Sequence, residues 1–278
     1  MSDNSNTLVL CGCGWLGGYL ASHFANSRQV IGTTRSHDKA QQLRNQGIRP
    51  LHFTLSDSAD TLSELSANAT VVLNIPPGRR NTNLDEFTRH MCDLISALYR
   101  HQPPQQLIFI STTSVYGEQE GDVTTASGVA PVTASGEAHI AIEKHVRRSA
   151  PENGYILRLA GLVGPDRHPV KSLAGRTLSG ANQVVNLVHV DDVVATITAL
   201  MAQRPQNKLW QLSSSDHPMR GEYYPAMAEQ LGLAPITFSD RLDKNAPPTG
   251  KSINPQATVE ELGLTLNFAS PWQMNTIQ

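Results

Sequence analysis

The chain has 278 residues, which suits one large α/β domain, or a nucleotide-binding domain with a smaller substrate-binding portion. Its 22 lysines and arginines nearly balance 24 aspartates and glutamates, so nothing points to a nucleic-acid or membrane-surface partner. No apolar run approaches the length that crosses a bilayer, and the polar start Met1–Asn6 lacks the apolar core of a signal peptide. The three cysteines do not make a disulfide framework. We therefore expect a cytoplasmic protein.

A glycine-rich motif opens the chain. The apolar run Leu8–Cys11 breaks into G-x-G-x-x-G, and helical spacing of apolar residues follows over Trp15–Ala25. In this motif the glycines allow a tight turn, close approach to a pyrophosphate, and close packing of helix on strand. We expect a dinucleotide with its pyrophosphate at the N-terminus of this helix. The expected cofactor contacts are Gly12, Gly14, Trp15, Leu16 and Gly17 in this loop, Thr34, Arg35 and Ser36 after the second strand, and Ile75 and Pro76 after the fourth.

Two cysteines flank the first glycine, in the order Cys11-Gly12-Cys13. A zinc site would need further ligands, and the spacing is not that of a C-x-x-C redox pair. We therefore expect no metal site. Cys11 is expected to pack as a small hydrophobic residue, and Cys13 to lie in the loop, where its oxidation would impair cofactor binding.

The end of the second strand indicates which dinucleotide is bound. The strand Gln29–Thr34 runs into Arg35 and Ser36, and none of the residues at this end is acidic. A free ribose 2′-hydroxyl is usually bound there by Asp or Glu, whereas a guanidinium suits a 2′-phosphate. We therefore favour NADP, with NAD as the second choice. The alternative for Arg35 is an ordinary exposed arginine at the start of a helix.

Strand and helix patterns alternate through the first two thirds of the chain, and several strands are nearly continuous in apolar residues. This alternation predicts an α/β fold with a doubly wound parallel sheet of Rossmann type. A smaller C-terminal cap that binds the substrate is expected beside it. The expected dinucleotide domain is 1–165, with 184–215 returning to it, and the substrate-binding region is 166–183 and 216–278. The strand candidates are Thr7–Cys11, Gln29–Thr34, Pro50–Thr54, Thr70–Ile75, Leu107–Ser111, Tyr155–Leu159, Val184–Val190 and Trp210–Ser213.

Three further segments carry a family resemblance: Ser111–Gly117, Leu157–Pro165 and Asn186–Val193. With the glycine motif, they make the chain similar over nearly its whole length to extended short-chain dehydrogenases/reductases of the NAD-dependent epimerase/dehydratase type, in an atypical bacterial branch. The usual opening G-x-x-G-x-x-G is altered, because Cys11 replaces its first glycine. The resemblance implies hydride transfer at a carbinol carbon of a small-molecule substrate such as a nucleotide sugar. It also implies a homodimer.

The same resemblance implies a catalytic set that this chain carries only in part. A family Ser or Thr that hydrogen-bonds substrate maps to Thr112. The family's acid/base Tyr is followed four residues later by Lys, which lowers the phenol pKa. None of the six lysines follows a tyrosine at that spacing, and alignment puts Ser135 in place of Tyr and His139 in place of Lys. Three accounts stay open: His139 moves protons, Tyr116 supplies the phenol, or the protein is a non-catalytic NADP(H)-binding regulator or redox sensor.

Candidate substrate-binding residues follow the sixth strand. Arg158, Arg167, His168 and Lys171 form a basic cluster in sequence, and Arg167, His168 and Lys171 are expected to bind an anion. An ordinary solvated loop is the alternative. Asn186 matches a residue that can touch substrate in relatives, and Asp192 is expected to cap the following helix.

Overall fold

The structure is a computed structural model, and it describes residues 4–78 and 83–274. The chain divides into two compact units. Unit 1 comprises Met1–Val115, Pro131–Arg158 and Ile197–Trp210, and unit 2 comprises Tyr116–Ala130, Leu159–Thr196 and Gln211–Gln278. The segments expected to bind substrate, 166–183 and 216–278, fall within the ranges of unit 2.

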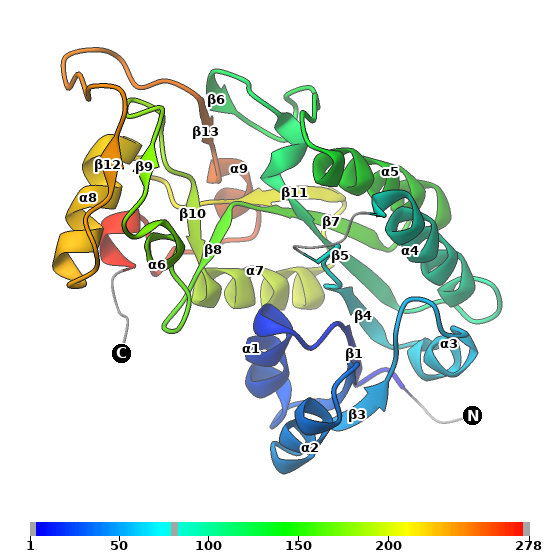
Figure 1. Cartoon of the computed structure of the whole chain (residues 1–278). Helices are drawn as coiled ribbons and strands as arrows, with labels where there is room; N and C mark the ends of the chain where they lie inside the picture. Colours follow the sequence, from blue (N-terminus) through cyan, green and yellow to red (C-terminus); the bar gives the residue numbers. More distant parts are fainter. Residues whose placement is uncertain (1–3, 79–82, 275–278) are drawn as a thin grey trace. The chain divides into compact units, whose positions relative to one another are not determined.

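A parallel sheet of seven strands confirms the predicted Rossmann fold, with the order β11-β7-β5-β4-β1-β2-β3 (Figure 1). From β1 the chain builds outward first to one side and then to the other, so the direction changes between β1 and β4. Ligands of such sheets bind at this switch point, beyond the carboxyl ends of the strands. The strands are β1 Thr7–Cys11, β2 Gln29–Thr34, β3 Arg49–His52, β4 Thr70–Leu73, β5 Gln106–Thr112, β7 Gly154–Leu159 and β11 Leu209–Leu212.

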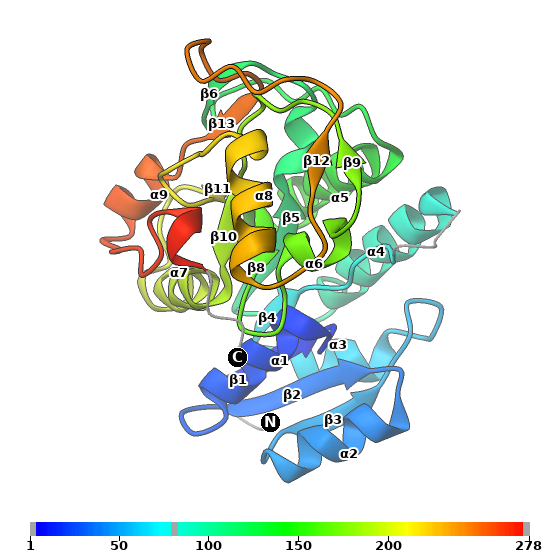
Figure 2. The same cartoon turned by 60° about the vertical axis from the view of Figure 1, so that its left-hand side comes forward.

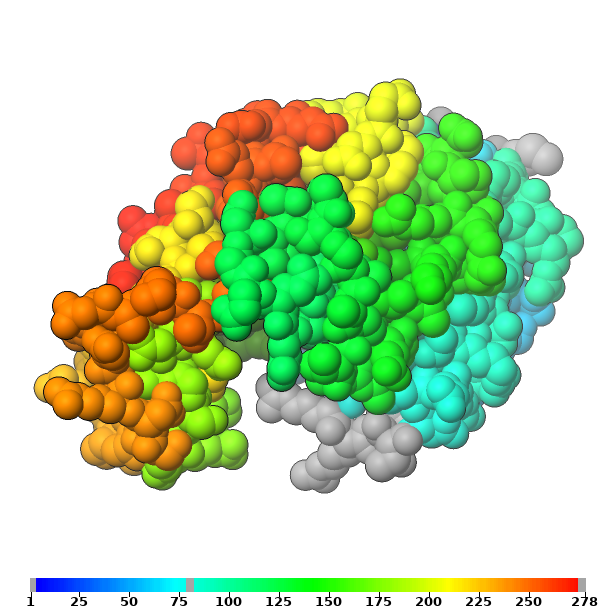
Figure 3. Space-filling model, turned by 90° about the horizontal axis from the view of Figure 1, so that it is seen from above, coloured from blue at the N-terminus to red at the C-terminus, as the bar shows by residue number. Residues whose placement is uncertain are grey.

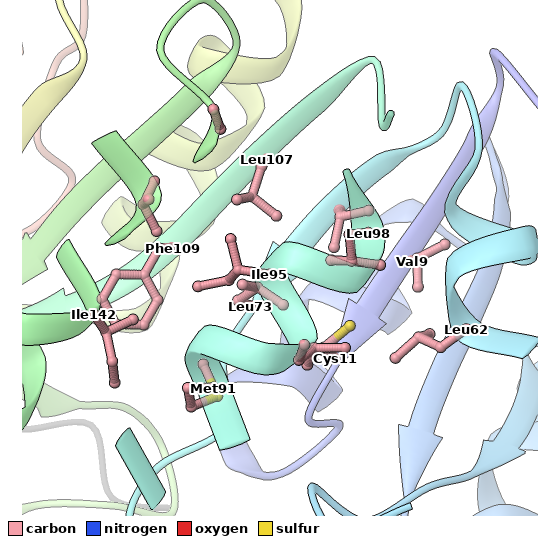
Figure 4. Close-up of a cluster of buried hydrophobic side chains, with 14 of the residues drawn as sticks. Val9, Cys11, Leu62, Leu73, Met91, Ile95, Leu98, Leu107, Phe109 and Ile142 are labelled. Atoms are coloured by element: carbon pink, nitrogen blue, oxygen red, sulfur yellow. The ribbon is translucent and has the colours of Figure 1, made fainter. Parts of the chain in front are cut away.

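Continuous burial explains why these runs are strands. All five residues of β1 and all four of β4 are buried, as expected where helices cover both faces of a sheet. On one face, helices α3 (Asp60–Ser66), α4 (Leu84–Leu98) and α5 (Ala134–Ser149) enclose a core that includes Cys11, Leu73 and Phe109 (Figure 4). Helices α1 (Trp15–Phe24) and α2 (His37–Asn45) pack on the strands of the other face (Figure 1).

Unit 2 is built from short strand pairs around a second core. β8 pairs with β10, β9 with β12, and β6 with β13, all in parallel (Figure 2). The predicted strand Val184–Val190 is shorter than expected, because β10 covers only Leu187–His189. The other elements are η1 Thr113–Tyr116, β6 Gly121–Val123, β8 Gly161–Val163, α6 Pro169–Leu173, β9 Thr177–Leu178, α7 Val190–Gln203, α8 Arg220–Gln230, β12 Thr237–Phe238, β13 Lys251–Ile253, α9 Gln256–Glu261 and η2 Pro271–Gln273, with α7 shared between the units.

Across residues 4–78 and 83–274, none of the helices combines the length and the apolar character that a membrane span requires.

Candidate functional site

Unit 1 contains a cavity of about 1010 Å³ at the carboxyl ends of its first strands. Its walls come from the glycine loop, the end of β2, the segment after β3, the end of β4 and the start of α4. Seven of the ten expected cofactor residues line it: Gly14, Trp15, Thr34, Arg35, Ser36, Ile75 and Pro76. Gly12, Leu16 and Gly17 do not line the cavity but belong to the same loop and helix.

The three glycines of the loop differ in whether the surrounding structure requires a residue without a side chain. Gly12 has φ +100°, and a Cβ there would lie 2.5 Å from the Asn74 carbonyl oxygen. A Cβ on Gly17 would lie 2.3 Å from the Gly12 oxygen. Both are therefore required by the fold itself. Gly14, in contrast, has nothing within 4 Å of a built Cβ, yet it lines the cavity. No packing neighbour therefore requires a glycine at position 14.

Two polar residues that the sequence analysis missed hold this loop. The Gly12 N–H donates to Thr33 Oγ1 at 2.8 Å, and the Cys13 N–H donates to the Thr33 carbonyl at 2.9 Å. On the other side, Asn74 Nδ2 donates to the Gly12 carbonyl at 3.2 Å. The signal available in the sequence was a polar residue at the end of each strand that borders β1.

Helix α1 begins at the loop without a side-chain cap, since its N-cap is Gly14. The N–H groups of a first helical turn lack partners within the helix, and they attract anions together with the helix dipole. No acidic residue occupies this first turn. These backbone groups therefore suit a pyrophosphate.

The β2 end of the cavity is basic. Arg35 is exposed, Lys39 is half-buried, and both line the cavity together with Ser36. The Ser36 hydroxyl accepts from the Lys39 N–H at 3.2 Å as the N-cap of α2, so its hydroxyl hydrogen remains available to a ligand. Lys39 was also missed; its signal is the spacing of four residues from Arg35, about one helical turn.

The paired cysteines are buried and inert. Cys11 is fully buried in the core of unit 1, as expected. Cys13 lines the cavity but is only 4% exposed, and burial raises the pKa of its thiol to about 12. Because oxidation proceeds through the thiolate, this thiol resists it. In the described part of the chain, no group of three or more metal-binding side chains is gathered to hold an ion.

Thr112 and His139 both belong to unit 1, where α5 packs on β5. Thr112 ends β5, and its hydroxyl lies 2.8 Å from the Ser114 hydroxyl. His139 stacks on Phe109, and its Nδ1–H donates to the Ser135 carbonyl at 2.7 Å. This bond leaves Nε2 as the atom that accepts a proton. Burial lowers the pKa of His139, so the neutral imidazole is favoured at neutral pH.

Tyr116 is placed in the interior of unit 2. Its side chain is 0% exposed, and its hydroxyl donates to Gln211 Oε1. Gln211 is itself held, because its Nε2 donates to the carbonyls of Val123 and Asn254, each at 2.7 Å. The phenol expected as one possible acid/base is thus part of a buried network, which argues against that role.

A buried ion pair lies beneath the β5–α5 region. Glu143 accepts from Arg158 Nε at 2.9 Å and Nη2 at 2.6 Å, and from the Ser111 hydroxyl at 2.6 Å. Glu143 and Arg158 are 2% and 3% exposed. Arg158 is therefore a structural residue, and it separates from the other members of the basic cluster identified in the sequence.

Replacing Glu143 by Gln is expected to destabilise the protein by about 3–5 kcal/mol, because it leaves a buried guanidinium without its countercharge. Urea unfolding measures the change. Glu137→Gln, an exposed glutamate on the same helix, is the control and should change stability by less than about 0.5 kcal/mol. Equal stability of the two variants would contradict the assignment.

The remaining residues of the expected basic cluster separate by burial. Arg167 and Lys171 are exposed in unit 2 and stay candidates for an anion. His168 is 4% exposed; its Nε2 lies 2.9 Å from the Tyr223 hydroxyl, and its Nδ1 accepts from the Val170 N–H at 3.2 Å. Because Nδ1 accepts, the neutral imidazole is the form that fits, and this argues against the anion-binding role expected of His168. Burial and the nearby Lys171 lower the pKa of His168 to about 4.

This histidine predicts a loss of stability in mild acid. The unfolded chain binds a proton at an ordinary histidine pKa of about 6.5, whereas the folded chain binds it only near pH 4. The folded state should thus lose about 3 kcal/mol between pH 6.5 and pH 4 from this group. Denaturant unfolding across this range should show a shallower pH dependence for His168→Asn than for wild type. The exposed control His101→Asn should retain the wild-type dependence.

Asn186 and Asp192 serve backbone segments of unit 2. Asn186 Nδ2 donates to the Lys251 carbonyl and its Oδ1 accepts from the Ile253 N–H, both at 2.8 Å. The carboxamide is thus occupied by β13 rather than open to a ligand. Asp192 accepts from the backbone N–H groups of Asn267 and Phe268, so it holds the C-terminal segment instead of capping α7 as expected.

The chain matches the sequence model of a known protein family. The model of the NAD dependent epimerase/dehydratase family matches residues 7–212. The chain belongs to this family. It is also 35% identical over 274 residues to Protein YeeZ of Escherichia coli (strain K12), covering 96% of this chain and 98% of that protein.

Solved structures of other proteins share the fold. MoeE5 in complex with UDP-glucose and NAD superposes with a TM-score of 0.79 at 21% identity, covering 98% of this chain and 97% of that one. UDP-glucuronic acid 4-epimerase from Bacillus cereus in complex with NAD gives 0.78 at 16% identity, with coverages of 98% and 97%. At these identities the likeness extends to the fold alone. The family membership agrees with the resemblance carried by Ser111–Gly117 and the glycine loop.

Proposed function

We propose that this protein binds NADP(H) in the unit 1 cavity and transfers hydride at a carbinol carbon of a small substrate, as an oxidoreductase or epimerase. The observation that carries the proposal is the pairing of an uncapped glycine loop with Arg35, Ser36 and Lys39 on one cavity wall. Cations and a hydroxyl at the end of β2 suit a ribose 2′-phosphate, whereas a free 2′-hydroxyl calls for a carboxylate.

The roles of the residues follow from their chemistry. The nicotinamide ring, when bound, supplies or accepts the hydride. The N–H groups from Gly14 onward would bind the pyrophosphate, and Arg35 with Lys39 would bind the 2′-phosphate. The Thr112 hydroxyl would orient the substrate hydroxyl. His139 Nε2, held neutral by burial, would accept its proton during oxidation and return it during reduction.

A second candidate function is a non-catalytic NADP(H)-binding regulator or redox sensor. It is supported by the burial of Tyr116 and by Ser135 at the position of the family's tyrosine. An aliphatic hydroxyl is a poor substitute for a phenol as proton donor. The neutral His139 and the retained Thr112 favour the enzyme.

Calorimetric titration with NADPH and NADH tests the cofactor proposal. We expect one NADPH per chain and affinity at least about tenfold tighter than for NADH, since charge-assisted hydrogen bonds discriminate by that much. Equal affinities would overturn the NADP assignment. Stopped-flow loss of NADPH absorbance with a panel of carbonyl compounds then separates the two functions: turnover with any of them excludes the pure sensor, and its loss in His139→Gln supports the proton role.

A nucleotide sugar is the substrate class proposed here, because MoeE5 binds UDP-glucose and the family is one of epimerases and dehydratases. The homodimer and the substrate role of 166–183 and 216–278 also stay predictions. Arg167 and Lys171, exposed within that region, are the proposed anion contacts of its surface.

A further inference from the structure

Lys251 is a lysine whose ammonium lies partly inside unit 2. Its side chain is half-buried, although lysines ordinarily extend their charged ends into water. Nζ donates a hydrogen bond to the carbonyl oxygen of Gly117, which ends the Val115-Tyr116-Gly117 motif. Burial lowers the pKa of Lys251, and the negative charge of Glu118 opposes this shift. The position is costly for a cation, so it needs an explanation.

The backbone of Lys251 is held on several sides. Lys251 opens strand β13, which pairs with β6 in the register Lys251 to Gly121. The carboxamide of Asn186 joins the carbonyl of Lys251 to the N–H of Ile253, and the Glu120 carboxylate accepts from the Gly250 N–H. Figure 3 shows the green segment that contains β6 beside the orange segment that leads into β13. The root of the side chain is thus fixed.

The acceptor of its hydrogen bond is fixed as well. Gln119 Nε2 donates to the Tyr116 carbonyl at 3.1 Å and also to the Gly128 carbonyl, which closes the loop after Gly117. The Tyr116 side chain anchors the same loop through Gln211. Preorganised groups bind a ligand with less loss of conformational entropy.

This charge forms no ion pair within the described residues, and Glu118 acts on it only from beyond ion-pair distance. Among residues 4–78 and 83–274, no carboxylate oxygen lies within 4.0 Å of Lys251 Nζ, since the ion pairs found there involve other residues. Its hydrogen-bond partner Gly117 is a neutral carbonyl, and an ammonium has three N–H donors. A partly desolvated cation that is not ion-paired is unfavourable, and an oxyanion ligand in direct contact would relieve that cost.

We propose that Lys251 binds an oxyanion of the substrate, a phosphate or a carboxylate, and that Asn186 is a positioning residue that holds Lys251 in place. The inference rests on the proposed function, because it assigns one anionic group to the substrate of that function. It also gives Asn186 a role: the residue expected to touch substrate acts through the backbone of β13 instead.

The test compares wild type with three variants of one residue. Lys251→Met removes the charge, Lys251→Gln keeps an N–H donor for Gly117 without charge, and Lys251→Arg keeps the charge. Each is titrated calorimetrically with UDP, UDP-glucose and UDP-glucuronic acid, and separately with NADPH. We expect the Met and Gln variants to lose about 10- to 100-fold in affinity for the probe, while Arg retains most of it. NADPH affinity should be unchanged in all three.

The three probes identify the source of the oxyanion. An equal loss for all of them assigns Lys251 to a phosphate, and a loss confined to UDP-glucuronic acid assigns it to the sugar carboxylate. Wild type that binds NADPH but none of the probes, or Lys251→Met that binds them as wild type does, overturns the inference and leaves the proposed function standing. Wild type that fails to bind NADPH overturns the proposed function instead.

An NMR measurement on wild type covers the case in which the two uncharged variants unfold. The six lysines give few side-chain signals, and the signal that is lost in the spectrum of Lys251→Arg, the variant that keeps the charge, belongs to Lys251. We expect its pKa to rise when the probe is added, because an oxyanion stabilises the charged ammonium. An unchanged pKa at saturating probe contradicts the proposal. Asn186→Ala should weaken probe binding without altering NADPH affinity, and Asn186→Asp should not restore it, since a carboxylate cannot donate to the Lys251 carbonyl.

Discussion

Arg35→Ala is expected to lower NADPH affinity about 10- to 100-fold while NADH affinity changes little. Arg35 lines the basic end of the unit 1 cavity, and a guanidinium hydrogen-bonds a 2′-phosphate that NADH lacks. Lys39→Met should act in the same direction, since Lys39 lines the same wall. Calorimetric titration of both dinucleotides gives the ratio of affinities, which is the quantity that the substitution should change.

Arg44→Ala is the matched control for Arg35. Arg44 lies on α2 with its guanidinium hydrogen-bonded to Gln41, and the cavity walls do not include it. The control should leave the ratio of affinities as in wild type. If Arg35→Ala weakens NADPH and NADH equally, then Arg35 does not recognise the 2′-phosphate and the NADP assignment fails.

Gly14→Ala and Gly17→Ala are expected to separate cofactor binding from stability. A Cβ at Gly17 meets the Gly12 carbonyl at 2.3 Å, so Gly17→Ala should cost about 3 kcal/mol or more in stability. A Cβ at Gly14 meets nothing within 4 Å, so Gly14→Ala should fold almost as stably as wild type. Its Cβ would instead stand where the pyrophosphate approaches the main chain, and NADPH affinity should fall about tenfold or more.

Urea unfolding and NADPH titration of the same two samples make the comparison. Gly47→Ala is unsuitable as a control, because Gly47 has φ +76° and would be strained for that reason alone. Gly128→Ala is suitable, since a Cβ there also meets nothing within 4 Å and the residue lies outside the cavity. Gly14→Ala that binds NADPH like this control would show that the loop does not approach a pyrophosphate.

Local sequence patterns were sufficient to predict the part of the site that the glycine loop and its flanking strands form. The glycine loop, the strand ends of β1 and β2, and Arg35 could be located because each depends on neighbours in sequence. The roles of Thr33 and Asn74 could not be assigned, since a polar residue at a strand end becomes informative only once β2 and β4 are known to border β1. To place Lys39 in the cavity, the position of the first turn of α2 had to be known.

Long-range contacts determine the surroundings of the residues whose roles were predicted wrongly, or only from the family resemblance. Tyr116 is buried because Gln211, 95 positions later, accepts its hydroxyl hydrogen bond. Asn186 is occupied by β13, about 65 positions away, and Asp192 by the backbone of Asn267, 75 positions away. Nothing in a short motif reports such partners. The short strand β13 was missed for the same reason: it pairs only with β6, which lies far earlier in the chain.

A crystal structure of the NADPH complex tests the central claim most directly. We predict the pyrophosphate at the N–H groups that follow Gly14, and the 2′-phosphate within hydrogen-bond distance of Arg35 and of Ser36 or Lys39. An adenosine ribose at the β2 end with its 2′-phosphate facing away from Arg35 and Lys39, or NADPH bound outside the unit 1 cavity, would contradict it.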